Sequence, residues 1–139
     1  MGTRSRVGVM HGDVCKSVYC HYDGYLDHTG QVLHKYYNSA EANRLVSRGD
    51  NSGVQETIEE MNFYSDRGED NVEWLVAHTF DEFLEQVEGC GGEYYYVMQD
   101  GVWYAGAVYD VPGLIKGGLV PLEDALARHT IEQLVAEDE

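Results

Sequence analysis

Two dipeptides that favour tight turns, Gly12-Asp13 and Asp100-Gly101, each separate two runs of strand-forming residues. A glycine in the first turn position suits a type II′ turn, Asp-Gly is a favoured type I′ pair, and both turn types join neighbouring antiparallel strands. Hairpins are therefore predicted over residues 4–23 and 93–109. These two hairpins restrict the chain to folds that contain an antiparallel sheet, which is the strongest constraint in the sequence.

Helical patterns lie between the hairpins and after the second one. Thr79 and Glu82 form a capping box in front of an apolar stripe with helical spacing. Ser39 is the expected N-cap of a helix over 40–48, and Pro121 is expected to open a C-terminal helix. Weaker patterns predict helical turns at 30–37 and 54–61 and strands at 62–65 and 72–78.

The order of these elements, in blocks without β-α-β alternation, is typical of an α+β fold. We expect a single domain over residues 1–139, with an antiparallel sheet built from β-hairpins and three or four helices packed on it. A chain of 139 residues buries about two-thirds of its unfolded surface. A hydrophobic content of 43% is sufficient for such a core.

The charge of the chain is strongly uneven. Residues 1–49 carry six basic and four acidic side chains, whereas residues 50–139 carry three basic and 21 acidic ones, so the net charges are +2 and −18. Direct binding of nucleic acid is not expected, because it needs Lys and Arg to replace counterions. An acidic surface attracts basic partners and speeds their encounter, although a solvated surface that aids solubility explains the same composition.

The first turn is expected to bring reactive side chains together. With Gly12-Asp13 as the loop, the numbers of paired residues sum to 25, so Arg6 lies opposite Tyr19 and Arg4 opposite His21 on one face. Guanidinium groups suit phosphate, and tyrosine rings stack on bases. A phosphate or nucleotide is the expected ligand, and the structural alternative is that the arginines pair with nearby carboxylates. The candidate ligand-binding residues are Arg4, Ser5, Arg6, Tyr19, His21, Asp23, Tyr25 and Arg67.

His21 and Asp23 also permit other interpretations. On one strand both point the same way, so the carboxylate could raise the basicity of the imidazole for general-base catalysis, or the pair could only stabilise a turn. The sequence has no G-x-S-x-G turn and no cysteine on the face of His21, so no catalytic residue is assigned and an enzyme is not the favoured expectation. The three cysteines match no zinc spacing, and no metal or cofactor is expected.

The second hairpin is rich in aromatic residues, which protein interfaces favour. Neighbouring side chains on a strand point to opposite faces. Tyr95 should therefore face away from Tyr94 and Tyr96, and at least one aromatic row is expected to lie outside the core. A charged turn at residues 66–70 adds carboxylates. The candidate partner-binding residues are Tyr95, Trp103, Tyr104, Asp66, Glu69 and Asp70.

Residues 2–5 are Gly-Thr-Arg-Ser, and residues 19–25 are Tyr-Cys-His-Tyr-Asp-Gly-Tyr. These segments resemble a group of small proteins of tailed bacteriophages and prophages, in which a Gly-Thr-Arg-Ser start precedes a segment of the type Tyr-x-His-Trp-Asp-Gly-Tyr. The chain departs from this pattern at Tyr22, where tryptophan is usual, and at Leu26, where proline is common. The resemblance implies a phage origin and an early accessory factor that acts on host machinery, rather than a particular chemistry. The matching segments are residues 2–5, 19–26 with Gly30 and Leu33, 49–50, 66–69 and 100–104.

The favoured expectation is an acidic phage accessory protein in the host cytoplasm. It would bind and inhibit, or redirect, a host defence or regulatory component with a basic surface, and its acids could imitate nucleic-acid phosphates. The alternative is a small nucleotide-binding protein that sequesters or hydrolyses a signalling nucleotide. No membrane contact is expected, because no apolar run approaches the roughly 20 residues that span a bilayer. The oligomeric state is open, with a homodimer as one option.

Overall fold

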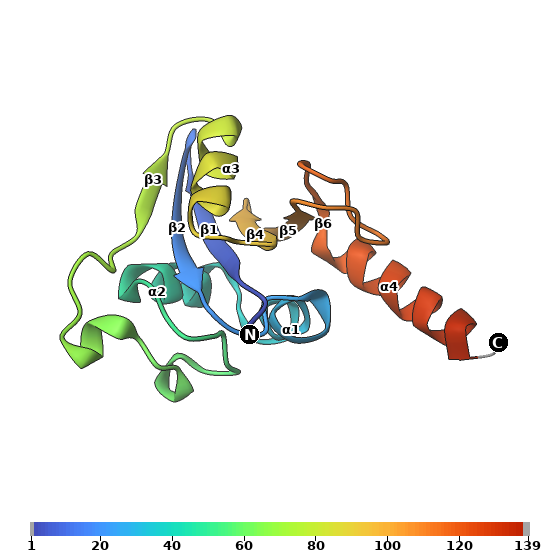
Figure 1. Cartoon of the computed structure of the whole chain (residues 1–139), viewed down its shortest axis with the longest axis horizontal. Coiled ribbons are helices and arrows are strands. Elements are labelled where there is room, and N and C mark those ends of the chain that lie inside the picture. Colours follow the sequence, from blue (N-terminus) through green and yellow to red (C-terminus); the bar gives the residue numbers. More distant parts are fainter. Residues whose placement is uncertain (1, 138–139) are drawn as a thin grey trace.

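The computed structural model describes residues 2–137, with side chains up to residue 131. Within that range, six strands form one sheet in the order β3-β2-β1-β4-β5-β6, and four α-helices pack around it (Figure 1). The chain is thus an α+β protein, as predicted. The strands are β1 (Ser5–His11), β2 (Val14–Cys20), β3 (Leu75–Ala77), β4 (Tyr94–Gln99), β5 (Val102–Ala107) and β6 (Val120–Pro121). The helices are α1 (Gln31–Tyr36), α2 (Ser39–Arg48), α3 (Phe80–Gly89) and α4 (Leu122–Glu137).

Both predicted hairpins are confirmed, although the ladder of the first ends at the pair Ser5 and Cys20, so the expected pairing of Arg4 with His21 is not part of it. In the first, Arg6 pairs with Tyr19 and His11 with Val14, so residues 12 and 13 form the loop. Its first residue, Gly12, has φ +64°, as a type II′ turn requires. In the second, Asp100 and Gly101 have φ +51° and +80°, and positive φ at both positions is the mark of a type I′ turn.

The sheet is mixed rather than purely antiparallel. Among the described strands, four of the five neighbouring pairs are antiparallel, and β1 and β4 are parallel. The cause is the position of β3, which pairs with the outer side of β2. From there the chain crosses over two strands to reach β4, and such a crossover needs a long connection, usually a helix, which is α3. The expectation of an antiparallel sheet is therefore confirmed only in part, because β3-α3-β4 adds one parallel crossover.

The two middle helices, α2 and α3, each begin at a side-chain cap. Thr79 Oγ accepts from the Glu82 N–H over 3.0 Å, which confirms the predicted cap of α3. At α2 the cap is Asn38, whose Oδ1 accepts from the Glu41 N–H over 2.9 Å. Ser39, the predicted N-cap, is instead the first helical residue. Asn and Ser cap equally well, so sequence alone does not choose between neighbours.

Each face of the sheet carries its own helical layer. On one face, α1, α2 and α4 cover the larger core, which includes Leu45 and Trp103. On the other face, α3 packs Phe83 and Val87 against β2 and β4. Because both faces are covered, all three tyrosines at 94–96 are buried (8%, 0% and 0% exposed). The expectation that one aromatic row lies outside the core was therefore wrong.

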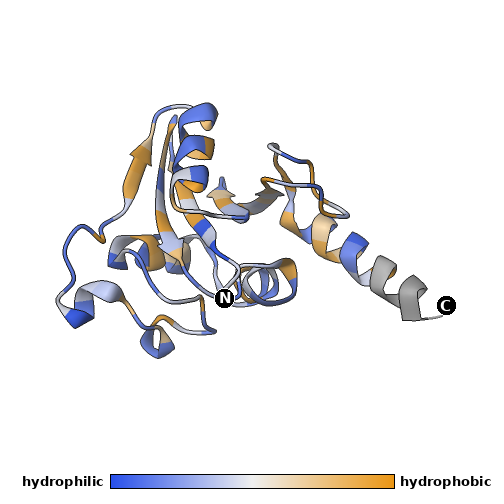
Figure 2. Ribbon diagram, in the orientation of Figure 1, coloured by the Kyte–Doolittle hydropathy of each residue, from blue (hydrophilic) through white to orange (hydrophobic). Residues whose placement is uncertain are grey.

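Three weaker predictions also change. The segment 54–61 forms only a 3₁₀ turn at Ile58–Glu60, and 62–65 gives a second one at Tyr64–Arg67 instead of a strand. The strand expected at 72–78 is shortened to β3, which lies at the outer edge of the sheet and is strongly hydrophobic (Figure 2). Between residues 2 and 137, no helix combines the length and the apolarity needed to cross a bilayer.

Candidate functional site

The first hairpin places the N-terminal residues beside the His21 segment. The Gly24 N–H donates to Thr3 O over 2.8 Å. Gly2 lies so close to Tyr22 that an added Cβ would come within 2.5 Å of its ring. The contact on which the predicted ligand site depends is therefore present.

The candidate ligand-binding residues nevertheless do not share one pocket. Only Arg6 and Tyr19 border a pocket of about 410 Å³ between β2 and the C-terminal end of α3. Ser5 is buried and, as the strand neighbour of Arg6, lies on the opposite face of β1. Tyr25 is 38% exposed. Arg67 stacks on the Tyr64 ring and pairs with Glu69 at 2.6 Å.

Arg6 is buried, with 3% of its surface exposed. Its Nε donates to Ser17 Oγ over 2.9 Å and a terminal nitrogen donates to Ser17 O over 2.8 Å. Asp50 borders the same pocket, and burial raises the pKa of its carboxyl against the lowering effects of the Tyr19 N–H and Arg6. Within the described residues, no carboxylate forms an ion pair with Arg6.

His21 has Tyr19 as its partner rather than Asp23. The Tyr19 hydroxyl lies 2.5 Å from His21 Nδ1, and burial raises the pKa of that hydroxyl while Arg4 lowers it. Because β2 ends at Cys20, His21 and Asp23 are not on one strand. Asp23 has a left-handed φ of +58° and is exposed. The side-by-side arrangement expected for general-base catalysis is therefore not formed.

The thiols of the two β2 cysteines are poor nucleophiles. Burial raises the pKa of Cys15 to about 11 and that of Cys20 to about 12, so both are protonated near neutral pH. The thiolate is the reactive form of cysteine. In the part of the chain that the structure describes, no cluster of three metal-ligating side chains is present.

The predicted partner-binding aromatics are inside the protein. Tyr95 is fully buried and its hydroxyl donates to Gly118 O over 2.7 Å. Trp103 is 6% exposed and its Nε1 donates to Tyr37 O over 2.8 Å. Tyr104 is half-buried. These bonds and this burial exclude Tyr95 and Trp103 from a surface contact in this conformation, because the sheet is covered on both faces.

The predicted partner-binding carboxylates are exposed, but two of the three are already paired. Asp66 pairs with Arg48 at 2.6 Å, and Glu69 pairs with Arg67 at 2.6 Å. Asp70 is exposed and has no ion pair among the described residues. The acidic turn therefore offers less free charge than its sequence indicates.

A further exposed surface lies along β3 and α3, and the sequence motifs did not predict it. No Lys or Arg occurs between residues 68 and 115, whereas that segment holds ten acidic residues. Asp81, Glu85 and Glu88 follow the i, i+4, i+7 spacing of one helical face, and all three are exposed on α3. We call them the α3 acidic stripe. None of them has an ion-pair partner in the described structure.

Next to this stripe, β3 exposes apolar side chains. Trp74, Leu75 and Val76 are 37%, 45% and 37% exposed, and we call them the β3 apolar run. Helix and edge are neighbours, because Gln86 Nε2 donates to Val76 O over 2.9 Å. The signal available in the sequence was the lack of Lys and Arg between residues 68 and 115. The sheet does bring one basic side chain to the run, because Lys16 Nζ lies 5.1 Å from the centroid of the Trp74 ring.

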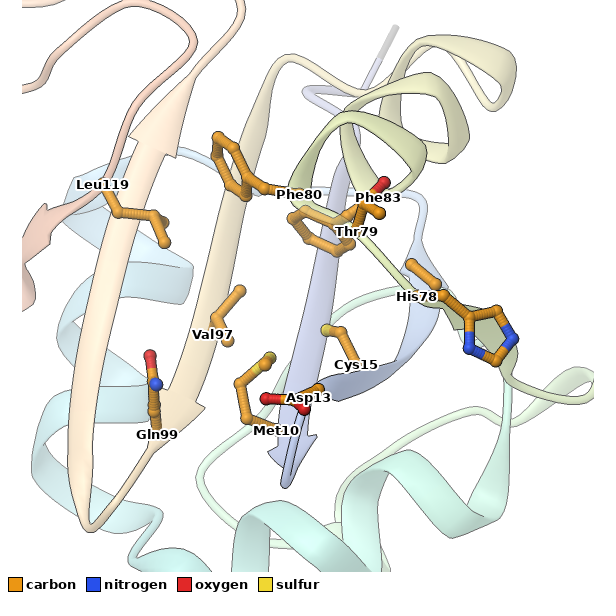
Figure 3. Close-up of a pocket in the computed structure, with 11 residues that line it drawn as sticks. Met10, Asp13, Cys15, His78, Thr79, Phe80, Phe83, Val97, Gln99 and Leu119 are labelled. Carbon is orange, nitrogen blue, oxygen red and sulfur yellow. The ribbon is translucent and has the colours of Figure 1, made fainter.

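On the inner side of α3 lies a pocket of about 580 Å³. Figure 3 shows Leu119 on one side of it, Phe80 and Phe83 of α3 on the other, and Val97 between them. Asp13 and Gln99 supply polar groups to the lining. A pocket of this size with a mainly apolar lining suits an apolar group, and its lining contains no Lys or Arg.

The chain therefore has a polar pocket at Arg6, an apolar pocket under α3, and an acidic, apolar surface along β3 and α3. No family model, no curated protein and no solved structure matches this chain, so its function has to be argued from its own geometry.

Proposed function

We propose that this chain is a protein-binding accessory factor that captures a basic partner on the surface formed by β3 and α3. The observation that carries the proposal is the α3 acidic stripe, which has no ion-pair partner among the described residues and adjoins the β3 apolar run. Protein interfaces combine a fully buried apolar centre with a polar rim. Charge complementarity steers the encounter and suppresses wrong partners.

The opposite layer of the molecule supports the proposal by contrast. There Arg44 pairs with Glu41 and Glu59, and Arg48 pairs with Asp66. Glu41, Glu59 and Asp66 are thus paired within the chain, so they offer less charge to a partner than the α3 acidic stripe does.

The resemblance to tailed-phage proteins suggests the context of this binding. In that context the partner is a host defence or regulatory component, which is inhibited or redirected when it binds. A partner that normally binds nucleic acid fits the same charge, because a carboxylate array can replace phosphates. No catalytic step is needed for this role.

The test is affinity capture from a lysate of the bacterial host with three forms of the protein. The first form is the wild type, and the second neutralises the α3 acidic stripe (Asp81→Asn, Glu85→Gln, Glu88→Gln). The third is a matched control that removes as much charge from the paired acids (Glu41→Gln, Glu59→Gln, Asp66→Asn). We expect the wild type and the control to retain the same basic protein and the stripe variant to lose it.

Salt gives a second check on the same capture. Exposed charges are screened beyond about 10 Å at 0.1 M salt and about 3 Å at 1 M, so high salt should release the partner. Equal capture by the stripe variant and the control would contradict the proposal, and so would the absence of any basic protein from all three samples.

Nucleotide binding is the second candidate, and the buried Arg6 is the observation that favours it. A buried charge is costly unless it is paired, and a phosphate beside Tyr19 would supply the missing partner. Asp50 and Glu73 border the same pocket and would repel that phosphate, so we place this function second. A thermal-shift screen against a nucleotide panel tests it, because a ligand at 100 times its Kd adds about 2.7 kcal/mol of stability. A nucleotide that stabilises the wild type and not Tyr19→Phe would support the site, and a panel without any shift would reject it.

A further inference from the structure

β3 has an open backbone edge, and the geometry points to its use. We infer that an extended segment of the basic partner adds to the sheet as a new strand outside β3, which deepens and rests on the proposed function. Strand addition of this kind draws affinity from backbone hydrogen bonds and specificity from alternate side chains.

The register shows which backbone groups of β3 face outward. Residues that flank a two-residue turn form a bonded pair, and bonded and non-bonded pairs then alternate along an antiparallel ladder. His11 and Val14 flank the turn, so Val9 and Lys16 are also a bonded pair and the Lys16 backbone faces β1. Lys16 is the residue opposite Val76, so Val76 receives no ladder bond from β2. Its N–H and C=O therefore point away from the sheet.

The side chain of Gln86 covers part of this edge. The Val76 carbonyl accepts from Gln86 Nε2 over 2.9 Å, which occupies the position of a neighbouring strand's N–H. The other end of the same amide, Gln86 Oε1, is buried without a hydrogen-bond partner in the described structure. Only one end of the Gln86 amide is therefore hydrogen-bonded. The N–H of an incoming strand can replace Gln86 Nε2 as the donor to the Val76 carbonyl. A strand that continued past Trp74 would gain a second pair of backbone bonds.

The two edges of the sheet differ in a way that supports this inference. At the far edge, β6 has only two residues, one of them Pro121, and α4 follows at once. Proline has no N–H to donate and blocks edge pairing. At β3, the apolar run is the one stretch of three consecutive exposed large apolar residues in the described structure.

The charges around β3 indicate whether the added strand comes from a second copy of this chain or from a basic segment of another protein. Glu73 directly precedes the apolar run, and the α3 acidic stripe lies on the helix that carries Gln86. Lys16 Nζ lies over the Trp74 ring, so one basic side chain stands against these four acidic ones. A second copy would bring another chain of net charge −16 against these acids, and like charges placed opposite each other destabilise a sheet. A segment that alternates basic and apolar residues meets both the carboxylates and the apolar run. The inferred occupant is therefore an extended basic segment of a different protein.

The experiment is an NMR titration of the ¹⁵N-labelled full-length protein with a capped seven-residue peptide that alternates lysine and valine. We expect the amide signals of Trp74 and Val76, whose N–H groups face away from β2, to shift. Val76→Pro removes the outward N–H and leaves the bonds to β2 intact. It should weaken peptide binding by about tenfold, the equivalent of one or two net backbone hydrogen bonds. Val76→Thr keeps the N–H and should recover most of the affinity that Val76→Pro loses, and Gln86→Ala, which removes the competing side-chain donor, should bind more tightly.

A second readout needs no change in the protein. Methylating alternate backbone nitrogens of the peptide along one edge removes its donors while its charge is kept, and should weaken binding like Val76→Pro. The inference of strand addition is wrong if the methylated peptide binds as tightly as the unmodified peptide, and the Val76→Pro protein as tightly as the wild type, while the signals of α3 shift. In that case the acidic surface alone binds the peptide. If the unmodified peptide shifts neither β3 nor α3, the inference fails together with the proposed function.

Discussion

α2 and α3 are built alike and differ in what they do with charge. Each has ten residues, and each begins at a side chain that caps the N–H of a glutamate three residues later. On α2, Arg44 and Arg48 pair with acids of the chain itself. On α3, the acidic stripe is exposed and no basic residue occurs. The same local rules therefore form both helices, and only α3 leaves its charge available to another molecule.

The two helices also differ in how completely they cover the sheet. α2 buries Leu45 fully within the larger core. α3 covers the other face only in part, with a pocket of about 580 Å³ at its inner side and the open edge of β3 at its outer side. The α2 side also borders a pocket, of about 360 Å³, which is lined by Arg44, Val46 and Trp74 among others. The two layers therefore differ in the size and charge of their pockets rather than in being closed or open.

Core truncation should give the largest difference between the layers. Leu→Ala and Phe→Ala substitutions in cores cost about 2–5 and 3–5 kcal/mol respectively, and the cost rises with the cavity that remains. We expect Leu45→Ala to lower the free energy of unfolding by about 4 kcal/mol and Phe83→Ala by about 3 kcal/mol, because Phe83 borders a pocket that is already open. Urea unfolding measures both. A larger loss for Phe83→Ala would show that the α3 layer is packed as tightly as the α2 layer.

The helix caps should show the similarity of the two helices. We expect Asn38→Ala and Thr79→Ala each to cost about 1 kcal/mol, since each leaves a first-turn N–H without its side-chain acceptor. Ser39→Ala is the matched control and should change stability by only a few tenths of a kcal/mol. Thermal unfolding of the three variants checks this. A large loss of stability for Ser39→Ala with none for Asn38→Ala would show that Ser39, the N-cap predicted from the sequence, caps α2.

Removing the charged side chain in the last turn should have opposite effects on the stability of the protein at α3 and at α2. A helix C-terminus stabilises cations and destabilises anions by about 0.3–1 kcal/mol. Glu88→Gln should therefore stabilise the protein by about 0.5 kcal/mol. Arg48→Gln should destabilise it by at least as much, because it also loses the ion pair with Asp66. Urea unfolding at low salt resolves both changes. If Glu88→Gln is destabilising, an internal partner holds Glu88, and the α3 acidic stripe is less available than we propose.

Asp50, which follows α2, should give the smallest effect, visible as a pH dependence. Burial raises the pKa of its carboxyl from the usual 3.8, so the folded protein keeps this proton to a higher pH than the unfolded chain. Its contribution to stability therefore falls as pH rises above 3.8. Asp50→Asn keeps an acceptor for the Tyr19 N–H and removes this fall. Between pH 4 and pH 7 we expect the free energy of unfolding of the variant, measured in urea, to rise relative to that of the wild type. A relative rise for the wild type would contradict the raised pKa of Asp50.

Local patterns predicted much of this fold because their causes are local. The register about residues 12 and 13, the turn at Asp100-Gly101 and the cap at Thr79 each depend on a few neighbouring residues. The parallel pairing of β1 with β4 is not local, since it depends on where β3 joins the sheet. The aromatic hairpin was misjudged for the same reason, because alternation shows that Tyr95 faces away from Tyr94 but not that α3 covers it.

The candidate site shows the same division. Proximity of the N-terminal residues to His21 followed from hairpin register, whereas the burial of Arg6 against Ser17 and the pairing of His21 with Tyr19 depend on side-chain packing. The sequence by itself determined the two hairpins, the cap of α3 and the acidic second half, because turn preference, helix capping and charge are properties of neighbouring residues or of composition. Only the tertiary structure decided which acids are neutralised, which aromatics are buried and which strand is left at the edge. Those outcomes depend on contacts between residues far apart in the chain.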